Sequence, residues 1–440
     1  MWLLPHLSAV SGAAVRVYYR ASRSGEAVPR SGPVLLVGNH PNSLLDPAFL
    51  AWVARRPVRF LAKATLFTDP LVGWIIRASG SIPVYRKQDD PALMDRNEDT
   101  FRAVHAARAG GSAVALFPEG TSHSDPTLAP LKTGAARIAL GAAGQIGGAF
   151  PIIPVGLVFR AKDRFRSQAH AVVGTALAWD DLAARGVDDR EAVHELTARI
   201  DRAMRGVTLN LARWEDEPVV RTAEAVWAAT HGAGDAPETR VARLAVTTDA
   251  LAALRAGGDA QWDRLARDVR EHARVLRALG VRPRDVQLDT NIGAAARWAL
   301  RRFTIGGTLG GAAAALAIAL FWLPYRVTGF AVARMHTEKD TQSTYRVFAG
   351  FVVFTSWIVA LAGLTLAAFG WLAGAVALVA LPALAIAGLH GAERWRWTLA
   401  TARNWMLLRR GDPRIASLRD RQLDLSRRLD AALAAHSTLG

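Results

Sequence analysis

The feature that most restricts how this chain can fold lies near its C-terminal end, where residues 347–387 hold 41 residues without one formally charged side chain. A helix needs about 20 apolar residues to cross a bilayer, so this stretch is long enough for two spans that turn near Gly370. Residues 305–325 form an earlier apolar stretch that is long enough for one span. The sequence therefore predicts a membrane region with two to three apolar spans.

Basic residues lie on both sides of these apolar stretches. One group consists of Arg326, Arg334, Lys339 and Arg346, and the other of Arg394, Arg396 and Arg403. The positive-inside rule favours the cytoplasmic side for both groups. A hairpin over residues 347–387 beside an interfacial 305–325 segment satisfies that rule, whereas three crossings satisfy the hydropathy. We favour three apolar segments in the inner cell membrane, with the soluble part on the cytoplasmic side, and both topologies stay open.

The composition indicates a soluble part joined to a membrane part and excludes several kinds of chemistry. The chain has 440 residues, of which 51% are hydrophobic, and this length predicts two or three domains. Its formal net charge of +16 comes almost entirely from arginine and favours anionic lipid surfaces and substrates. No basic-aromatic RNA-binding signature is present, so nucleic acid is not an expected partner. The lack of cysteine excludes disulfides, thiolate catalysis, Cys-zinc sites and iron–sulfur clusters.

Between about residues 32 and 180, short apolar strands alternate with helical patterns, which is typical of an α/β domain. The expected strands are 34–37, 59–62, 82–84, 113–117, 152–157 and 171–173. The expected helices are 43–55, 70–79, 91–109 and 130–145. Each polar cluster follows a strand, which is where open α/β sheets bind their ligands. We therefore assign residues 32–180 to one α/β domain.

The rest of the chain divides by composition into four further regions. Residues 1–31 begin with an apolar stretch that lacks a charged n-region, and they predict an N-terminal interfacial helix and not a signal peptide. Residues 181–300 are rich in arginine and alanine with amphipathic spacing, and they predict a helical region. The membrane region is expected at residues 301–392, and a basic helical tail at 393–440.

The most informative polar cluster is residues 39–47, Asn-His-Pro-Asn-Ser-Leu-Leu-Asp-Pro, which directly follow the first expected strand. Residues 43–46 resemble a capping box that opens a helix. His40 and Asp46 can meet if the loop folds back onto the helix start. Asp46 would then hold one tautomer of the imidazole, which leaves the other nitrogen to take a proton from a hydroxyl. The alternative is that Asp46 only caps its helix and His40 only binds a backbone carbonyl.

Three further clusters follow later strands. Residues 80–86 end in Arg86, whose planar guanidinium suits a phosphate or a carboxylate. Glu119 and Gly120 follow the most hydrophobic strand of the domain, in a segment that by itself predicts only a turn. Residues 151–156 form an apolar strand framed by prolines, which by itself favours a packing role or an edge position.

In this order and at these separations, the four clusters resemble the glycerolipid acyltransferase family, which includes bacterial lysophosphatidate acyltransferases and glycerol-3-phosphate acyltransferases. The resemblance covers roughly residues 30–180. It implies an α/β acyltransferase domain, with a mixed sheet flanked by helices, that is followed here by a helical region and C-terminal transmembrane helices. It places the catalytic dyad on His40 and Asp46. The residues expected to bind substrate are Asn39, Gly80, Arg86, Glu119, Gly120, Thr121 and Pro154, with Pro154 on the acyl-donor side.

The spacing within the dyad points to one branch of this family. The commonest spacing has four residues between His and Asp, whereas here there are five, residues 41–45. The longer form resembles the glycerol-3-phosphate and glycerone-phosphate acyltransferases typified by the fungal enzymes. The implied reaction moves an acyl group from a thioester, on CoA or acyl carrier protein, to one of these acceptors in phospholipid synthesis, without a further cofactor or metal. Lysophosphatidate is the alternative acceptor, and a non-catalytic lipid-binding membrane protein of the same fold is the second alternative.

Other catalytic patterns are absent or weak. The chain has no Gly-x-Ser-x-Gly elbow, His-Glu-x-x-His helix or Walker loop, which argues against an α/β-hydrolase, a zinc protease and an NTPase. Residues 122–125, Ser-His-Ser-Asp, contain the residue types of a triad, but neighbours on one loop rarely converge as a triad does. Lys63 and Lys132 are secondary candidates for contacts with anionic substrates, or they are ordinary surface charges.

Overall fold

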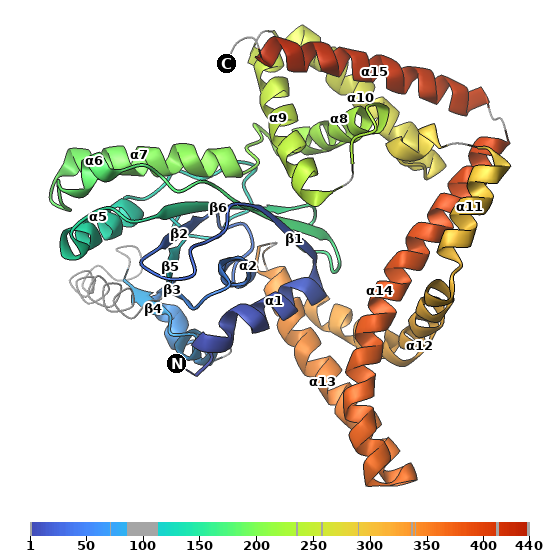
Figure 1. The fold of residues 1–440 in the computed structure, drawn as a ribbon, viewed down its shortest axis with the longest axis horizontal. Helices are drawn as coiled ribbons and strands as arrows, with labels where there is room; N and C mark the ends of the chain where they lie inside the picture. Colours follow the sequence, from blue (N-terminus) through green and yellow to red (C-terminus); the bar gives the residue numbers. More distant parts are fainter. Residues whose placement is uncertain are drawn as a thin grey trace. The chain divides into compact units, whose positions relative to one another are not determined.

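The structure is a computed structural model that describes residues 2–70, 72–85, 113–234, 236–256, 258–288, 290–335, 338, 340–410 and 413–437. It divides into two compact units, whose helices and strands are labelled in Figure 1. The first unit contains Met1–Trp214, Ala236–Val241 and Thr337–Thr344. The second contains Glu215–Asp235, Ala242–His336 and Tyr345–Gly440. The first unit therefore takes in two short segments that come later in the chain.

The first unit is built on a seven-stranded sheet in the order β1-β7-β6-β2-β5-β3-β4. All neighbouring strands run parallel except β6 and β7, so the sheet is mixed. The strands are β1 (Arg20–Gly25), β2 (Leu35–Gly38), β3 (Val58–Lys63), β4 (Ile82–Val84), β5 (Ala113–Leu116), β6 (Ile152–Phe159) and β7 (Gln168–Val173). The expected α/β fold with a mixed sheet and flanking helices is confirmed.

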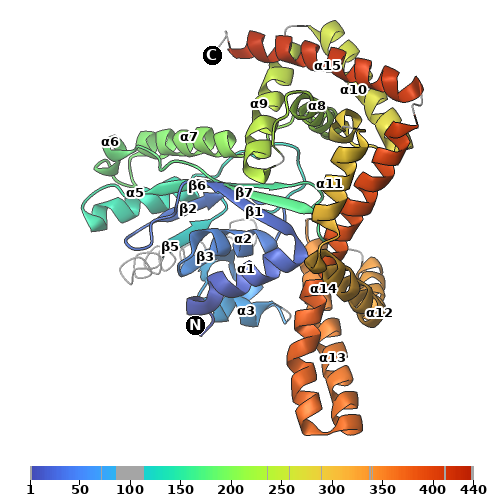
Figure 2. The ribbon, with the colours of Figure 1, turned by 45° about the vertical axis from the view of Figure 1, so that its right-hand side comes forward.

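Helices cover both faces of this sheet, as Figures 1 and 2 show. On one face, α2 (Leu45–Ala54) contacts the sheet and α1 (Leu7–Tyr18) packs on α2; on the other lie α5 (Gly134–Ile146), α6 (Asp180–Ala183) and α7 (Arg190–Val207). All four residues of β2 and of β5 are buried, which is typical of parallel strands enclosed between two helical layers. The core between the sheet and the α5–α7 layer includes Leu35, Val37, Val114, Leu140, Ile152, Trp179, Leu196 and Ile200.

The six expected strands are all present, and the seventh, β1, has no signal in the sequence. Its residues, Arg-Ala-Ser-Arg-Ser-Gly, contain almost no apolar side chain, yet they pair with β7 at the edge of the sheet. The sheet therefore reaches into residues 1–31, where an interfacial helix is expected. The helices expected at 43–55, 70–79 and 130–145 are observed as α2, α3 (Gly73–Ala78) and α5. The helix expected at 91–109 lies outside the described residues.

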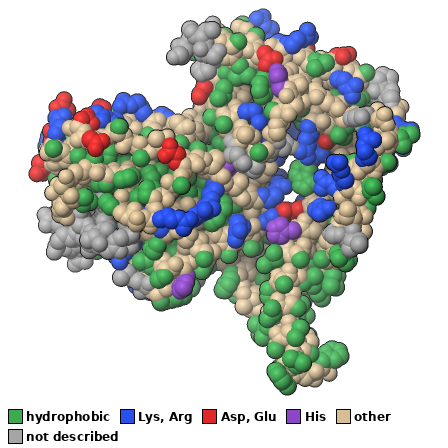
Figure 3. Space-filling view, in the orientation of Figure 1, with side chains coloured by type: hydrophobic (Ala, Val, Ile, Leu, Met, Phe, Trp, Pro, Cys, Tyr) green, Lys and Arg blue, Asp and Glu red, His purple; other side chains and the backbone are tan. Residues whose placement is uncertain are grey.

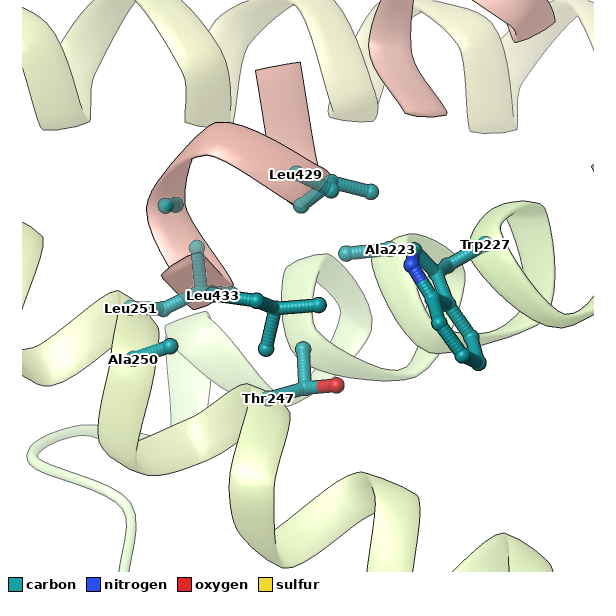
Figure 4. Close-up of a pocket in the computed structure, with 8 residues that line it drawn as sticks. Ala223, Trp227, Thr247, Ala250, Leu251, Leu429 and Leu433 are labelled. Carbon is teal, nitrogen blue, oxygen red and sulfur yellow. The ribbon is translucent and has the colours of Figure 1, made fainter. Parts of the chain in front are cut away.

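The second unit is helical throughout the part that the structure describes. Its helices are α8 (Glu217–Thr230), α9 (Pro237–Ala256, whose start belongs to the first unit), α10 (Asp259–Leu279), α11 (Ile292–Arg302), α12 (Ile305–Ala333), α13 (Gln342–Phe369, whose start also belongs to the first unit), α14 (Trp371–Arg409) and α15 (Pro413–Ser437). Short 3-10 helices are η1 (Leu4–His6), η2 (Ala64–Phe67), η4 (Trp214–Asp216) and η5 (Pro283–Gln287). A small apolar pocket lies between α8, α9 and α15, with Trp227, Leu251 and Leu429 in its wall, and holds none of the expected site residues (Figure 4).

Three helices are long and apolar enough to cross a membrane: Gly307–Ala333, Gln342–Phe369 and Trp371–Arg409. Gly370 separates the second from the third with a φ of 86°, so the expected turn falls at this glycine. Phe369 and Trp371 beside it are 78% and 76% exposed. Figure 3 shows hydrophobic side chains over the end of α13 and α14. Exposed apolar surface of this extent favours a lipid environment for these helices.

Helices α12 and α14 approach each other closely through small residues. A Cβ on Gly391 would lie 2.1 Å from the Gly310 carbonyl oxygen, and one on Gly388 would lie 2.9 Å from the Ala313 carbonyl oxygen. The indole of Trp395 donates a hydrogen bond to the Gly307 carbonyl at 2.9 Å. Small residues that let two backbones meet are a common means of helix association in membranes.

We expect Gly391→Ala to lower the melting temperature of the detergent-solubilised protein, because the new methyl group has no room beside Gly310. Overpacking of this kind costs about 1–3 kcal/mol. Gly363→Ala in α13 is the matched control, since a Cβ there meets nothing within 4 Å and alanine favours a helix by about 1 kcal/mol. Melting temperatures that rise together in the two variants would contradict the α12–α14 contact.

Candidate active site

His40 and Asp46 meet at the carboxyl ends of the parallel strands, beside the central strand β2. His40 lies two residues after β2, and Asp46 is the second residue of α2. The distance from His40 Nδ1 to Asp46 Oδ2 is 2.8 Å, and the two side chains are 19% and 0% exposed. The imidazole stacks on the ring of Phe117 at 4.1 Å. Among the described residues Nε2 has no hydrogen-bond partner, so this nitrogen is available to a substrate.

The Asp46 carboxylate is turned back toward the loop and away from the helix end. Besides His40, the backbone N–H of Asn42 donates to Oδ2 at 2.6 Å. Burial raises the pKa of the Asp46 carboxyl above its ordinary value, and the hydrogen bond with His40 opposes this shift. The expected capping box at residues 43–46 is wrong: Leu44 is the N-cap of α2 and no side chain caps it. Ser43 instead adopts a φ of 45°, which bends the loop so that the carboxylate reaches His40.

A second carboxylate, Glu119, holds the backbone of this loop. Its Oε1 accepts a hydrogen bond from the His40 N–H at 2.7 Å, and its Oε2 accepts one from the Ala129 N–H at 2.8 Å. The ring of His123 also contacts Oε2 through Nε2. The Glu119 side chain is fully buried. Both oxygens are therefore used to join the loops after β2 and β5, and contact of Glu119 with a substrate stays a prediction.

Gly120 is needed beside Glu119 for a conformational reason. Its φ is 77°, a value that L-residues rarely adopt. A Cβ at this position would lie 2.8 Å from the ammonium nitrogen of Lys132. The Glu-Gly pair is thus a turn whose carboxylate is aimed into the site, and not only a surface turn.

Lys162 and Tyr19 also reach this loop, and the sequence analysis selected neither of them. The Lys162 ammonium donates to the Pro41 carbonyl at 2.6 Å, to Ser124 Oγ at 2.7 Å and to the His123 carbonyl at 3.3 Å. The phenol oxygen of Tyr19 accepts a hydrogen bond from the Asn42 amide at 2.8 Å. Both residues are distant in the sequence from His40, and neither stands in a recognisable motif.

The other expected site residues take part in the fold of the domain. The Asn39 amide makes two hydrogen bonds with the backbone of Leu157, at 2.7 and 3.1 Å, and so joins the loop to β6. Gly80 follows the end of α3 with a φ of 70°. Pro154 is buried inside β6 and faces Val37 of β2 in the ladder. Thr121 is exposed. Their roles in substrate binding stay predictions.

Three cationic residues complete the set of candidates. Lys63 is the last residue of β3, and Lys132 lies before α5, beside Gly120. Arg86 lies outside the described residues.

The Ser-His-Ser-Asp run at 122–125 does not form a triad, because the His123 ring is turned to Glu119. No group of three or more His, Asp or Glu side chains in the described ranges is arranged to hold a metal ion.

Comparison with known proteins identifies the domain that carries these residues. The model of the Acyltransferase family matches residues 20–158, which run from the start of β1 almost to the end of β6. Both members of the dyad, Glu119 and Pro154 lie inside this matched range, whereas Lys162 lies just beyond it.

Curated proteins that are similar to part of this chain include two kinds of glycerolipid enzyme. The chain is 31% identical over 134 residues to a glycerol-3-phosphate O-acyltransferase of Saccharomyces cerevisiae, a match that covers 30% of this chain and 18% of the yeast protein. It is 30% identical over 161 residues to a chloroplastic 1-acyl-sn-glycerol-3-phosphate acyltransferase of Brassica napus, a match that covers 36% of this chain and 43% of the Brassica protein. The chain thus spans less than half the length of each of these relatives.

The crystal structure of a 1-acyl-sn-glycerophosphate acyltransferase from Thermotoga maritima is also similar in part. The sequence identity is 18% and the TM-score is 0.33, with 46% of this chain and 76% of that chain covered.

We expect Glu119→Gln to lower the free energy of unfolding by about 1–3 kcal/mol, because one carboxylate oxygen becomes an amide donor that faces another donor. Denaturant or thermal unfolding of the purified protein measures this change. Asp125→Asn is the control on the same loop: its carboxylate is 69% exposed, and an exposed pair with His123 is worth less than about 1 kcal/mol. Equal stability of the two variants would remove Glu119 from its anchoring role.

Proposed function

We propose that this chain is a membrane-bound O-acyltransferase that moves a fatty acyl group from an acyl thioester to glycerol-3-phosphate or glycerone phosphate. The observation that carries the proposal is the His40–Asp46 pair, in which a buried carboxylate holds one imidazole nitrogen and the other nitrogen has no hydrogen-bond partner among the residues that the structure describes. The match of residues 20–158 to the Acyltransferase family supports the reaction class. The similarity to a yeast glycerol-3-phosphate O-acyltransferase and the five residues between His40 and Asp46 support the acceptor.

In the proposed reaction, His40 Nε2 removes the proton from the acceptor hydroxyl as its oxygen attacks the thioester carbonyl carbon. A new C–O bond forms, and the tetrahedral intermediate then loses the thiol through cleavage of the C–S bond. The thiolate recovers the proton from the imidazolium, so His40 returns to its starting form. Asp46 keeps Nδ1 protonated and stabilises the imidazolium between these steps. The acyl thioester, on CoA or acyl carrier protein, is a substrate, and no further cofactor is required.

The phosphate of the acceptor requires a cation near the dyad. Arg86 is the proposed ligand, because its guanidinium binds a phosphate with two parallel hydrogen bonds. The proposed place of action is the cytoplasmic face of the inner membrane, where the apolar helices α12 to α14 are embedded. Three candidate spans support membrane attachment, and the basic residues that flank them support this orientation.

We expect His40→Ala to reduce the rate of acyl transfer by about 10²–10⁴-fold, which is the usual effect of removing a general base. The assay follows a radiolabelled acyl-CoA donor with the purified full-length protein. His194→Ala, which removes an exposed histidine of α7, is the matched control and should keep full activity. A His40→Ala enzyme with most of its activity would overturn the dyad assignment.

Lysophosphatidate is the second candidate acceptor, because the relatives include 1-acyl-sn-glycerol-3-phosphate acyltransferases at similar identity. We expect kcat/KM to be highest for glycerol-3-phosphate or glycerone phosphate when these are compared side by side with lysophosphatidate. The physical reason is that a small phosphorylated acceptor is bound by polar contacts, whereas a lysolipid also needs an apolar groove. A strong preference for lysophosphatidate would reject the spacing argument and leave the dyad intact. No transfer to any of the three would favour the non-catalytic alternative.

A further inference from the structure

A short piece of chain that leads from α12 into the first residues of α13 belongs to the first unit and not to the second. Its residues Asp340 and Ser343 are buried, with 4% and 0% exposure. Each makes a hydrogen bond with one of the two loops that surround His40. Ser343 lies 301 residues from its partner in the sequence, and Asp340 lies 218 residues from its own.

Ser343 acts on the loop that carries the dyad. Its hydroxyl donates a hydrogen bond to the side-chain oxygen of Asn42, which is itself fully buried. The amide nitrogen of Asn42 donates to the Tyr19 phenol at 2.8 Å, so both ends of this amide are fixed. The backbone N–H of the same residue donates to Asp46 at 2.6 Å. A hydrogen-bonded path therefore runs from Ser343 through Asn42 and Asp46 to His40.

Asp340 acts on the neighbouring loop. The Ser122 hydroxyl donates a hydrogen bond to Asp340 Oδ2. In the sequence, Ser122 lies between Glu119 and His123. Glu119 accepts a hydrogen bond from the His40 backbone, and the backbone N–H of His123 donates to the His40 carbonyl at 3.1 Å. A buried carboxylate needs such a partner, since an unpaired one is strongly unfavourable. The position of Asp340 is thereby linked to the loop that supports His40 from the other side.

We propose that Asp340 and Ser343, here called the clamp residues, are positioning residues of the acyl-transfer site: they hold the loops after β2 and β5 in the arrangement that sets the His40–Asp46 geometry. This inference rests on the proposed function. It means that the acyltransferase domain is completed by a residue just before α13 and a residue in the first turn of α13, both far outside the family match, which ends at residue 158. Transfer activity then depends on these two residues as well as on the domain.

The first test compares two hydroxyl deletions only two residues apart in the full-length protein. Ser343→Ala leaves the buried Asn42 oxygen without its donor and should lower kcat about tenfold, with the KM of the acceptor nearly unchanged. Thr341→Ala should keep full activity, because its hydroxyl bonds the Glu338 carbonyl at 3.1 Å within the same segment. Ser343→Thr retains a hydroxyl and should restore most of the rate. A loss confined to KM, or an equal loss in the Ala and Thr variants, would overturn the positioning role.

The second test does not depend on activity and uses the absence of cysteine from the chain. In the double variant Ser122→Cys and Asp340→Cys, mild oxidation should form an intramolecular disulfide, seen as a change in electrophoretic mobility that a reductant reverses. Each single variant is the control and should show no change. If no cross-link forms in the double variant, the clamp contact is absent and the inference fails. If the cross-link forms but the wild-type protein transfers no acyl group, the contact holds and the proposed function is what fails.

Discussion

The local structure of the site depends on one buried group, the Asp46 carboxylate. A carboxylate with no exposure needs hydrogen-bond donors, because the loss of hydration costs several kcal/mol. The His40 ring and the Asn42 N–H both donate to Oδ2, whereas the buried Oδ1 has no hydrogen-bond partner among the described residues. The left-handed bend at Ser43 lies between Asn42 and Asp46 and lets the chain turn back, so that Oδ2 meets both donors.

The same histidine is fixed a second time through its backbone. Glu119 accepts a hydrogen bond from the His40 backbone N–H, while Asp46 accepts one from the ring nitrogen Nδ1. Two buried carboxylates, one from the loop after β5 and one from the first turn of α2, therefore hold one residue. Glu119 sets the position of the His40 backbone, and Asp46 sets the tautomer of the imidazole and the direction in which Nε2 points. Proton transfer requires both, because a general base must be in reach and correctly protonated at once.

Much of the fold and part of the site were predictable from the sequence, and the limit has a physical cause. The strand before His40 and the helix after it are local patterns, so they place the histidine and Asp46 on either side of one turn. The capping-box prediction failed because it treated Asp46 as a partner of its own helix, whereas His40 and Asn42 bind it more closely. Tyr19, Lys162 and Ser343 could not be found, since each reaches the loop through tertiary contacts over a long sequence separation. β1 was missed because it has no apolar pattern: its polar residues are kept in the sheet by backbone hydrogen bonds to β7, at the outermost position of the sheet, and not by burial.

The reversal of direction between β6 and β7 has a consequence for which residues reach the site. In β2 to β6, which run parallel to one another, the residues that follow the end of each strand lie on the same side of the sheet as His40. β7, and β1 beside it, run in the opposite direction, so on that side lie the residues that precede the start of each of these two strands. Tyr19 immediately precedes β1, Lys162 lies in the connection that leads into β7, and the two are joined by a hydrogen bond from the phenol to the Lys162 carbonyl. We therefore expect a change in the length of the β6–β7 connection to affect the dyad loop, whereas the connection from β1 to β2 runs to the start of β2, at the opposite end of the strands from His40.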